Sequence, residues 1–268
     1  MRDVVLIGLP TDSHSSFLRG PAGAPPLIRA ALHSDHGNQA SENGLEIGRD
    51  IALRDRGDLP LTEGRGDFDL IRMAALEAAQ TGAAPLFLGG DHSVTFPIIA
   101  GLAEALGPVD ILHFDAHPDL YDDFEGDPLS HASPFARIME KGLARRLVQV
   151  GIRTLNQHCR DQAERFGVEM VAMRDFSPAT VPIPDGRPLY VSIDLDALDP
   201  AFAPGVSHHE PGGLSVRDVL AVLARIDRPI VGGDVVEYNP NRDLNGVTAV
   251  VAAKFVKELA AMCARSEG

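Results

Sequence analysis

The feature that most limits the fold of this chain is a series of short, almost continuously apolar segments. Because apolar and polar residues do not alternate in them, these segments are typical of parallel β-strands that are buried on both faces. Longer amphipathic stretches, typical of helices, separate them. The predicted strands are residues 4–9, 84–90, 109–114, 146–152, 168–173, 188–194 and 229–237, and the predicted helices include 67–81, 94–106, 216–226 and 246–263. The alternation predicts an α/β fold, with three α-β-α layers around a mainly parallel sheet.

Two stretches resist regular assignment. Residues 10–26 are rich in Gly, Pro and Ser, and residues 33–66 are polar, with at most one short strand at "IALRD" (51–55). Loops of this length within a compact domain are usually functional. No linker or internal repeat divides the chain, so we expect one domain over residues 1–268.

Composition narrows the class of partner. The net charge of −14 disfavours nucleic acid and anionic membrane surfaces, and it favours the approach of metal ions and cationic small molecules. The apolar runs are much shorter than the ~20 residues that a membrane span needs. The N-terminal segment "MRDVVLIGLP" lacks a signal-peptide pattern, and the two cysteines, Cys159 and Cys263, form no disulfide framework. A cytoplasmic location is therefore expected.

Acidic residues gather where four of the predicted strands end. Since ligands of open α/β sheets bind beyond the carboxyl ends of the strands, these residues are expected to meet at one edge. The groups are Asp91 and His92, then Asp115, His117 and Asp119, then Asp194, Asp196 and Asp199, and finally Glu237. Several carboxylates held close together are costly without a cation. The strand ends therefore predict a metal site.

Spacing and donor type refine that prediction. In Asp115-x-His117 and in Asp194-x-Asp196, alternate residues of an extended segment project to the same face. The set is rich in oxygen and includes two imidazoles but no thiolate, which favours a hard-to-borderline ion such as Mn²⁺ over structural zinc. The donors exceed what one tetrahedral ion uses, so two ions roughly 3.5–4 Å apart are expected, and such a pair activates water as a nucleophile.

Three motifs at these strand ends resemble those of the ureohydrolases, the family of arginases and agmatinases. They are "GGDHS" (89–93), "DAHPD" (115–119) and "SIDLDALDPAFAPG" (192–205). The resemblance extends over nearly the whole chain and is closest to the arginases of plants. It implies an arginase-like fold, a hydrolase that cleaves a small cationic guanidino substrate to urea and an amine, two Mn²⁺ ions per subunit, and a homo-oligomer, commonly a trimer or hexamer.

The resemblance also implies roles for individual residues. One ion would be held by His92, Asp115, Asp119 and Asp194, and the second by Asp115, His117, Asp194 and Asp196, so that Asp115 and Asp194 bridge. Glu237 matches the carboxylate that binds the guanidinium group, and His131, in "SHASPF", matches the histidine that protonates the leaving amine. With the bridging Asp115, these two form the expected catalytic set.

Other polar residues near these motifs have simpler interpretations. We expect Asp91 to orient His92, His113 to be structural, and Asp199 to form a turn. His208 is a candidate for the mouth of the substrate site, whereas its neighbour His209 points away.

The residues expected at the outer end of the site bear on the choice of substrate. Tyr121 stands where animal-type arginases carry an asparagine that binds the substrate carboxylate, and Thr154 stands where they carry an acidic residue. Tyr121 is therefore the candidate contact for the amino-acid end of arginine. Arginine is the first choice, agmatine the alternative, and a guanidino acid a weaker third. Two other classes remain: a deacetylase-like amidohydrolase, disfavoured by ligands for two metals, and a non-catalytic metal-binding oligomer, disfavoured by Glu237 and His131.

Overall fold

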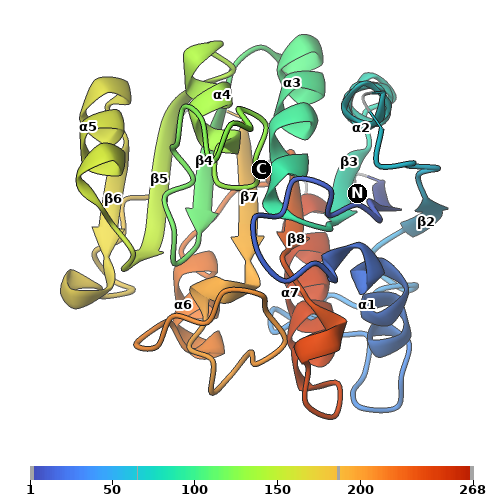
Figure 1. The fold of residues 1–268 in the computed structure, drawn as a ribbon. Coiled ribbons are helices and arrows are strands. Elements are labelled where there is room, and N and C mark those ends of the chain that lie inside the picture. The colour runs from blue at the N-terminus through green and yellow to red at the C-terminus, as the bar shows by residue number, and fades with distance from the viewer. Residues whose placement is uncertain (1–2, 65, 186–187, 266–268) are drawn as a thin grey trace.

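The eight β-strands found in the described part of the chain belong to one parallel sheet. The computed structural model describes residues 3–64, 66–185 and 188–265. The strand order across the sheet is β2-β1-β3-β8-β7-β4-β5-β6, and every pairing between named strands is parallel (Figure 1). The strands are β1 (Val4–Gly8), β2 (Leu53–Asp58), β3 (Ala84–Leu88), β4 (Val109–Phe114), β5 (Ala144–Ile152), β6 (Glu169–Ala172), β7 (Leu189–Asp194) and β8 (Gly232–Val236).

Helices cover both faces of this sheet. The α-helices are α1 (Ala24–Leu32), α2 (Asp67–Gln80), α3 (Thr95–Leu106), α4 (Pro134–Glu140), α5 (Gln157–Phe166), α6 (Val216–Leu223) and α7 (Val247–Cys263). The short 3₁₀ helices are η1 (Pro21–Gly23), η2 (His92–Val94), η3 (Met173–Asp175), η4 (Leu195–Ala197) and η5 (Pro240–Arg242). In the described part of the chain, no helix has the length and apolarity needed to cross a membrane.

Two hydrophobic cores lie on opposite faces of the sheet. One packs α1, α6 and α7 against it, with buried side chains such as Ile28, Val219 and Phe255. The other packs α2, α3 and α4, with Ile71 and Phe135 among its members. The strands contribute alternate residues to the two cores, which explains why their sequences are apolar throughout. The predicted three-layer α/β fold is confirmed.

The register of the four central strands brings the functional segments together. Leu88 of β3 pairs with Val235 of β8, and Val235 in turn pairs with Ile193 of β7. Ile193 pairs with Phe114 of β4. These residues form one row across the sheet, so the residues that follow them emerge side by side at the carboxyl edge. Strands that are far apart in the sequence thus deliver their polar ends to one place.

The observed elements differ from the predicted ones in a few places. The strand expected at residues 51–55 is β2, at Leu53–Asp58, an edge strand whose residues are mostly exposed. Residues 10–26 are irregular as expected only up to η1, because α1 begins at Ala24 with two prolines in its first turn. Helices α4 and α5 were not predicted. The first has seven residues, and the second is polar and buries only Cys159 and Gln162.

Close packing between α2 and α3 predicts that Gly101→Ala destabilises the fold. A Cβ at Gly101 would lie 2.2 Å from the main-chain oxygen of Arg72 and 2.9 Å from Cβ of Ala75. Alanine is the better helix former by about 1 kcal/mol, but overpacking costs about 1–3 kcal/mol, so we expect a net loss of stability. Denaturant unfolding measures it. The control is Gly37→Ala, whose methyl group would meet only the Lys257 ammonium, at 3.9 Å. A Gly101→Ala protein as stable as the wild type would contradict this packing.

Candidate metal centre and active site

A pocket of about 220 Å³ opens at the carboxyl edge of the central strands. Its lining includes eight of the residues predicted for the site: His117, Asp119, Tyr121, His131, Asp194, Asp196, His208 and Glu237. The other two, His92 and Asp115, are almost completely buried and contact the pocket residues from below. The structure therefore brings all the predicted site residues into one place.

The first group of donors surrounds His92. Its Nδ1 lies 3.1 Å from Oδ2 of each of three carboxylates, those of Asp115, Asp119 and Asp194. This nitrogen is buried, yet among the described residues it has no hydrogen-bond partner of acceptable geometry. A buried nitrogen facing three carboxylate oxygens at equal distance is the arrangement expected of metal ligands rather than of a hydrogen-bonded core.

The second group of donors surrounds His117. Its Nδ1 lies 3.3 Å from Oδ1 of Asp115 and 3.1 Å from Oδ2 of Asp196. Asp115 therefore faces both groups, one through each oxygen. Asp194 faces the His92 group through Oδ2, whereas its Oδ1 accepts a hydrogen bond from the main-chain N–H of Asp196. The bridging role implied for Asp194 remains a prediction.

The electrostatics of the cluster call for cations. Burial, together with repulsion from Asp196 and Asp115, raises the pKa of Asp194 well above its usual range. Burial lowers the pKa of the His92 imidazole, but the surrounding carboxylates outweigh it and raise that pKa well above its usual value. The carboxylates that raise these pKa values would also attract divalent cations. A pair of divalent ions held by these oxygen and imidazole donors fits the same set of residues.

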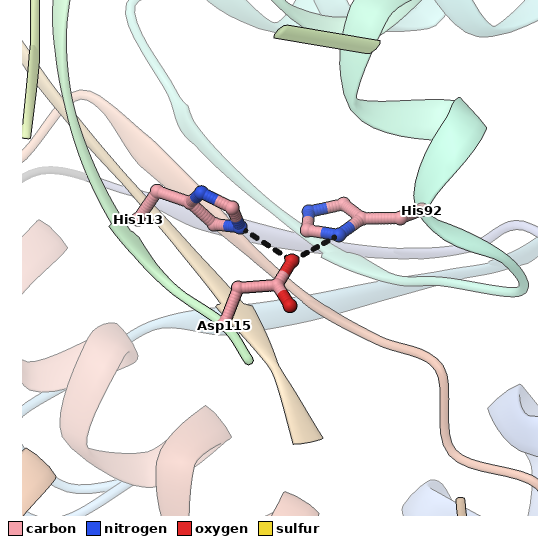
Figure 2. A group of neighbouring side chains, drawn as sticks. All are labelled: His92, His113 and Asp115. Atoms are coloured by element: carbon pink, nitrogen blue, oxygen red, sulfur yellow. Dashed lines mark hydrogen bonds and ion pairs between the residues drawn. The ribbon is translucent and has the colours of Figure 1, made fainter. Parts of the chain in front are cut away.

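His113 supports Asp115 rather than completing the donor set. Gln149 Nε2 donates to the carbonyl oxygen of Pro118 at 2.6 Å, which fixes the orientation of its amide group, and the same nitrogen lies 3.1 Å from Nδ1 of His113. Nδ1 is therefore the acceptor, and Nε2–H donates to Oδ2 of Asp115 at 2.9 Å. In Figure 2, His92 and His113 approach that one oxygen from opposite sides. The interpretation of His113 as structural agrees with this geometry.

A second support lies under His92. Its Nε2 is 3.1 Å from the hydroxyl group of Ser192, which donates to Oδ1 of Asp234 at 2.6 Å. The other oxygen of Asp234 accepts hydrogen bonds from Tyr190 and Thr95, both at 2.8 Å. This buried carboxylate holds the serine, and the serine holds the imidazole, with its Nδ1 turned towards the carboxylate cluster.

The role expected of Asp91 was wrong. Its Oδ1 accepts from the main-chain N–H and the hydroxyl group of Ser93, so Asp91 caps η2. Its Oδ2 accepts from the main-chain N–H of His14 at 3.0 Å. Ser192, not Asp91, contacts the His92 ring. Asp199 does form the predicted turn, since it accepts from the main-chain N–H groups of Ala201 and Gly212.

Glu237 and His131 form a buried pair on the opposite wall of the pocket. Oε1 of Glu237 lies 2.8 Å from Nδ1 of His131 and accepts from the main-chain N–H of His92 at 2.9 Å. Oε2 is buried and has no hydrogen-bond partner among the described residues. Burial lowers the pKa of His131, but the Glu237 carboxylate outweighs burial and raises it to about 9. One carboxylate oxygen thus remains for a ligand with N–H groups.

Tyr121 and His208 lie at the outer part of the pocket. The Tyr121 ring stacks on His158, with ring centroids 5.3 Å apart, and its hydroxyl oxygen accepts from Nδ2 of Asn156 at 2.5 Å. The His208 ring lies between those of Phe17, His117 and His131, at centroid distances of 5.4 to 5.6 Å, and burial lowers its pKa. Both side chains are placed to contact a ligand. His209 instead contacts the carbonyl oxygen of Pro204.

The comparisons with known proteins agree with this site. The sequence profile of the arginase family matches residues 2–262. The chain belongs to the arginase family. It is 52% identical to arginase 1, mitochondrial, of Arabidopsis thaliana, over 96% of this chain and 80% of that protein. The solved structure of arginase from Medicago truncatula superposes with a TM-score of 0.91 at 47% identity, covering 98% of this chain and 87% of that chain. Agmatinase of Bacillus anthracis is 32% identical, over 96% of this chain and 90% of that protein.

Membership of the family makes the protein a hydrolase that acts on the C–N bond of a guanidino group. The residues that hold the metal-binding and substrate-binding side chains in place, however, were found only from the structure. Sequence patterns did not reveal Gln149, Asp234 or Asn156, because each acts through a contact with a distant segment. Ser192 carried a usable signal, since it precedes Asp194 and Asp196 with the same spacing of two.

The shared position of Asp115 predicts that Asp115→Ala loses both ions. Removing this carboxylate deprives both the His92 and the His117 groups of an oxygen donor. After reconstitution with Mn²⁺, elemental analysis is expected to find far less than two ions per chain. The control is Asp123→Ala, an exposed aspartate of the same segment that accepts only from the main-chain N–H of Gly126. A fully loaded Asp115→Ala protein would refute the bridging role.

The hydroxyl group beneath His92 predicts a smaller effect for Ser192→Ala. Loss of a residue that orients a metal-binding imidazole weakens metal affinity by roughly 10–100-fold. We expect titration with Mn²⁺ to show this loss for one ion, with the second ion bound as in the wild type, because His117 does not contact Ser192. Equal weakening of both ions, or of neither, would show that Ser192 does not act through His92.

Proposed function

We propose that the protein is a binuclear manganese arginase that hydrolyses L-arginine to L-ornithine and urea. The observation that carries this proposal is the free Oε2 of Glu237, a buried carboxylate oxygen in the wall of a pocket that also contains the metal-type donor cluster. A planar guanidinium group offers the N–H donors that such an oxygen lacks. The family assignment supplies the class of reaction, and this geometry indicates where the reacting group binds.

The ion pair would be held by the two groups described above. His92, Asp115, Asp119 and Asp194 would bind one ion, and His117, Asp115 and Asp196, with Asp194 as the implied bridge, would bind the other. Mn²⁺ suits a donor set of carboxylates and imidazoles without thiolate. Such ions supply Lewis acidity, which makes a water molecule a nucleophile near neutral pH and stabilises developing negative charge.

Glu237 positions the substrate. Oε1 is occupied by the His92 main-chain N–H and by the His131 ring, which fixes the carboxylate in the wall of the pocket. Oε2 then faces the guanidinium group, and a charge-assisted contact in a buried site is strong and directional. The same carboxylate stabilises a protonated His131. His131 is therefore placed to protonate the amine as the C–N bond breaks.

Two observations bear on the choice between arginine and agmatine. Identity to the plant arginase is 52%, against 32% to the agmatinase, and this favours arginine. At the outer end of the pocket, Asn156 donates to the hydroxyl oxygen of Tyr121, and the phenolic O–H, which also lies near the Cys159 thiol, can turn to donate to a substrate carboxylate. Agmatine remains the second candidate, because none of the described residues that line the pocket is a lysine or arginine.

Two further predictions belong to this proposal. One is a cytoplasmic location, and the other is assembly into a trimer or hexamer, which rests on the resemblance to the family. The plant relative named above is mitochondrial by its name. Fractionation of the source cells and light scattering of the purified protein test these two points.

The decisive assay compares L-arginine and agmatine as substrates of the Mn²⁺-loaded protein, with urea and the amine product both identified. We expect ornithine and urea from arginine at a higher kcat/KM than putrescine and urea from agmatine. Putrescine from agmatine alone would make the protein an agmatinase. Urea from neither substrate, with two ions bound, would reject the proposal.

The role of Glu237 predicts a sharp separation of metal binding from turnover. Glu237→Gln keeps the shape of the side chain but removes its charge, so the guanidinium group loses its anionic partner. We expect kcat/KM to fall by roughly 10²–10³ or more, as for other charge-stabilising contacts, with both ions still bound. The exposed Glu104, which pairs with Arg72 on the surface, provides the control variant Glu104→Gln. A Glu237→Gln enzyme with near-normal kcat/KM would remove Glu237 from the substrate site.

A further inference from the structure

The irregular segment after β1 contributes a residue to the catalytic wall of the pocket. Ser16 lies in the loop of residues 11–20, which the sequence analysis left without a role. Its main-chain N–H donates to Nε2 of His131 at 3.1 Å, and its Oγ lies 2.8 Å from the same nitrogen. The main-chain N–H and the hydroxyl group of Ser16 therefore both contact Nε2 of His131, the proton donor of the proposed function.

This contact determines where the imidazole carries its proton. A main-chain N–H can only donate, so Nε2 must offer its lone pair to Ser16. The other ring nitrogen, Nδ1, lies 2.8 Å from the carboxylate of Glu237, which can only accept when ionised. In the neutral ring, the single proton therefore lies on Nδ1. Protonation of Nε2 produces the cation that Glu237 stabilises, and the Ser16 N–H favours its return to the neutral form.

The two residues differ in their access to water. His131 is only 8% exposed. Ser16, in contrast, is exposed and also lines the pocket. In the described structure, Glu237 covers one ring nitrogen and Ser16 covers the other. A proton that moves between solvent and Nε2 therefore meets the Ser16 hydroxyl group first.

The loop is built to hold Ser16 in this position. The carbonyl oxygen of Leu18 accepts from the Ser207 hydroxyl group and from Nδ2 of Asn239, both at 2.8 Å. Leu18 itself has a left-handed backbone, with φ of 41°, an unfavourable conformation for a leucine. On the other side of Ser16, the main-chain N–H of His14 donates to Asp91 at 3.0 Å. Anchors on both sides, and strain next to the residue, indicate a defined position rather than a loose surface loop.

We propose that Ser16 is the outer end of the proton path to His131, in the reaction assigned above. Its hydroxyl O–H bond breaks as an N–H bond forms at Nε2, and Oγ takes a proton from a water molecule or a buffer acid in solvent. The imidazolium then releases its Nδ1 proton on the Glu237 side, where the amine leaves. Serine ends as it began, but histidine is left as its other tautomer, with the proton on Nε2. It regains the starting tautomer when Ser16 returns that proton to solvent and Nδ1 takes a proton from a water molecule in the pocket.

The test is Ser16→Ala, which removes the hydroxyl group and leaves the main-chain N–H in place. If Ser16 carries the proton, kcat for arginine is expected to fall by roughly tenfold or more, a part of the 10²–10⁴ that a positioned proton carrier contributes. KM and the content of two ions per chain are expected to stay unchanged. A small acid such as imidazolium, added at constant pH and ionic strength, should restore kcat in proportion to its concentration, and the solvent isotope effect on kcat should rise.

Two control variants separate this role from a structural one. Ser16→Thr keeps a hydroxyl group and is expected to behave like the wild type, without a response to imidazolium. Ser13→Ala removes an exposed hydroxyl group of the same loop, whose only contact given by the structure is Thr11 at 3.4 Å, and it is expected to leave kcat unchanged. An Ser16→Ala enzyme with normal kcat, or one that added acid does not rescue, would overturn the proton path.

A second measurement works without turnover. In metal-free protein labelled with ¹⁵N at its ten histidines, the His131 signals are identified by their absence from the His131→Asn spectrum. We expect the neutral ring to carry its proton on Nδ1, and finding that proton on Nε2 would overturn the inference. Failure of the proposed function has a different outcome: the wild type would then release no urea from either substrate, whatever the position of the proton.

Discussion

The structure depends on the burial of several carboxylates in one place. Asp115, Asp119, Asp194 and Asp196 are each at most 7% exposed, and they meet at the carboxyl ends of two neighbouring strands. Charges buried so close together destabilise a fold unless cations compensate them. The parallel sheet brings these carboxylates together, because its register places β4 and β7 side by side. Bound metal would compensate this negative charge, so metal binding is expected to stabilise the fold.

Two of the six non-glycine residues with a positive φ in the described part of the chain lie at this site. Asp119 and Glu237 both have left-handed backbone conformations, with φ of 49° and 62°, which cost of order 1–3 kcal/mol each for residues other than glycine. Local hydrogen bonds hold them there: the carbonyl oxygen of Asp119 accepts from the N–H of Phe135, and the N–H of Glu237 donates to the carbonyl oxygen of Gly90. Glu237 directly follows β8 and Asp119 lies in the loop after β4, and both residues line the pocket. The strained backbone conformations of Asp119 and Glu237 therefore lower the stability of the fold at the place where the functional side chains converge.

The features that could be predicted from the sequence are those whose residues recur with a regular spacing. Strands that are buried on both faces have continuous runs of apolar residues in the sequence, so the sheet could be predicted. Metal ligands on an extended segment recur at every second residue, so the donor set could be predicted as well. Supporting residues have no such repeat. Gln149 reaches His113 from the neighbouring strand β5, and Asp234 reaches Ser192 from β8, so both depend on the order of strands in the sheet. Asp91 was misassigned because adjacency to His92 in sequence is no guide to the contact of a side chain in a tight turn.

His92 of the metal site and His131 of the substrate site are held in place in a similar way. Each has one nitrogen aimed at the chemistry and the other held by a serine: Ser192 holds Nε2 of His92, and Ser16 lies at Nε2 of His131. The difference between them lies in what stands behind the serine. Ser192 is buried and donates to the fixed carboxylate of Asp234, so its proton has one place to go and the imidazole keeps one orientation. Ser16 is exposed, so its hydroxyl group can exchange protons with water. The same side chain therefore holds an imidazole in place at the metal centre and is proposed to transfer protons at His131, and the burial or exposure of the serine itself decides which.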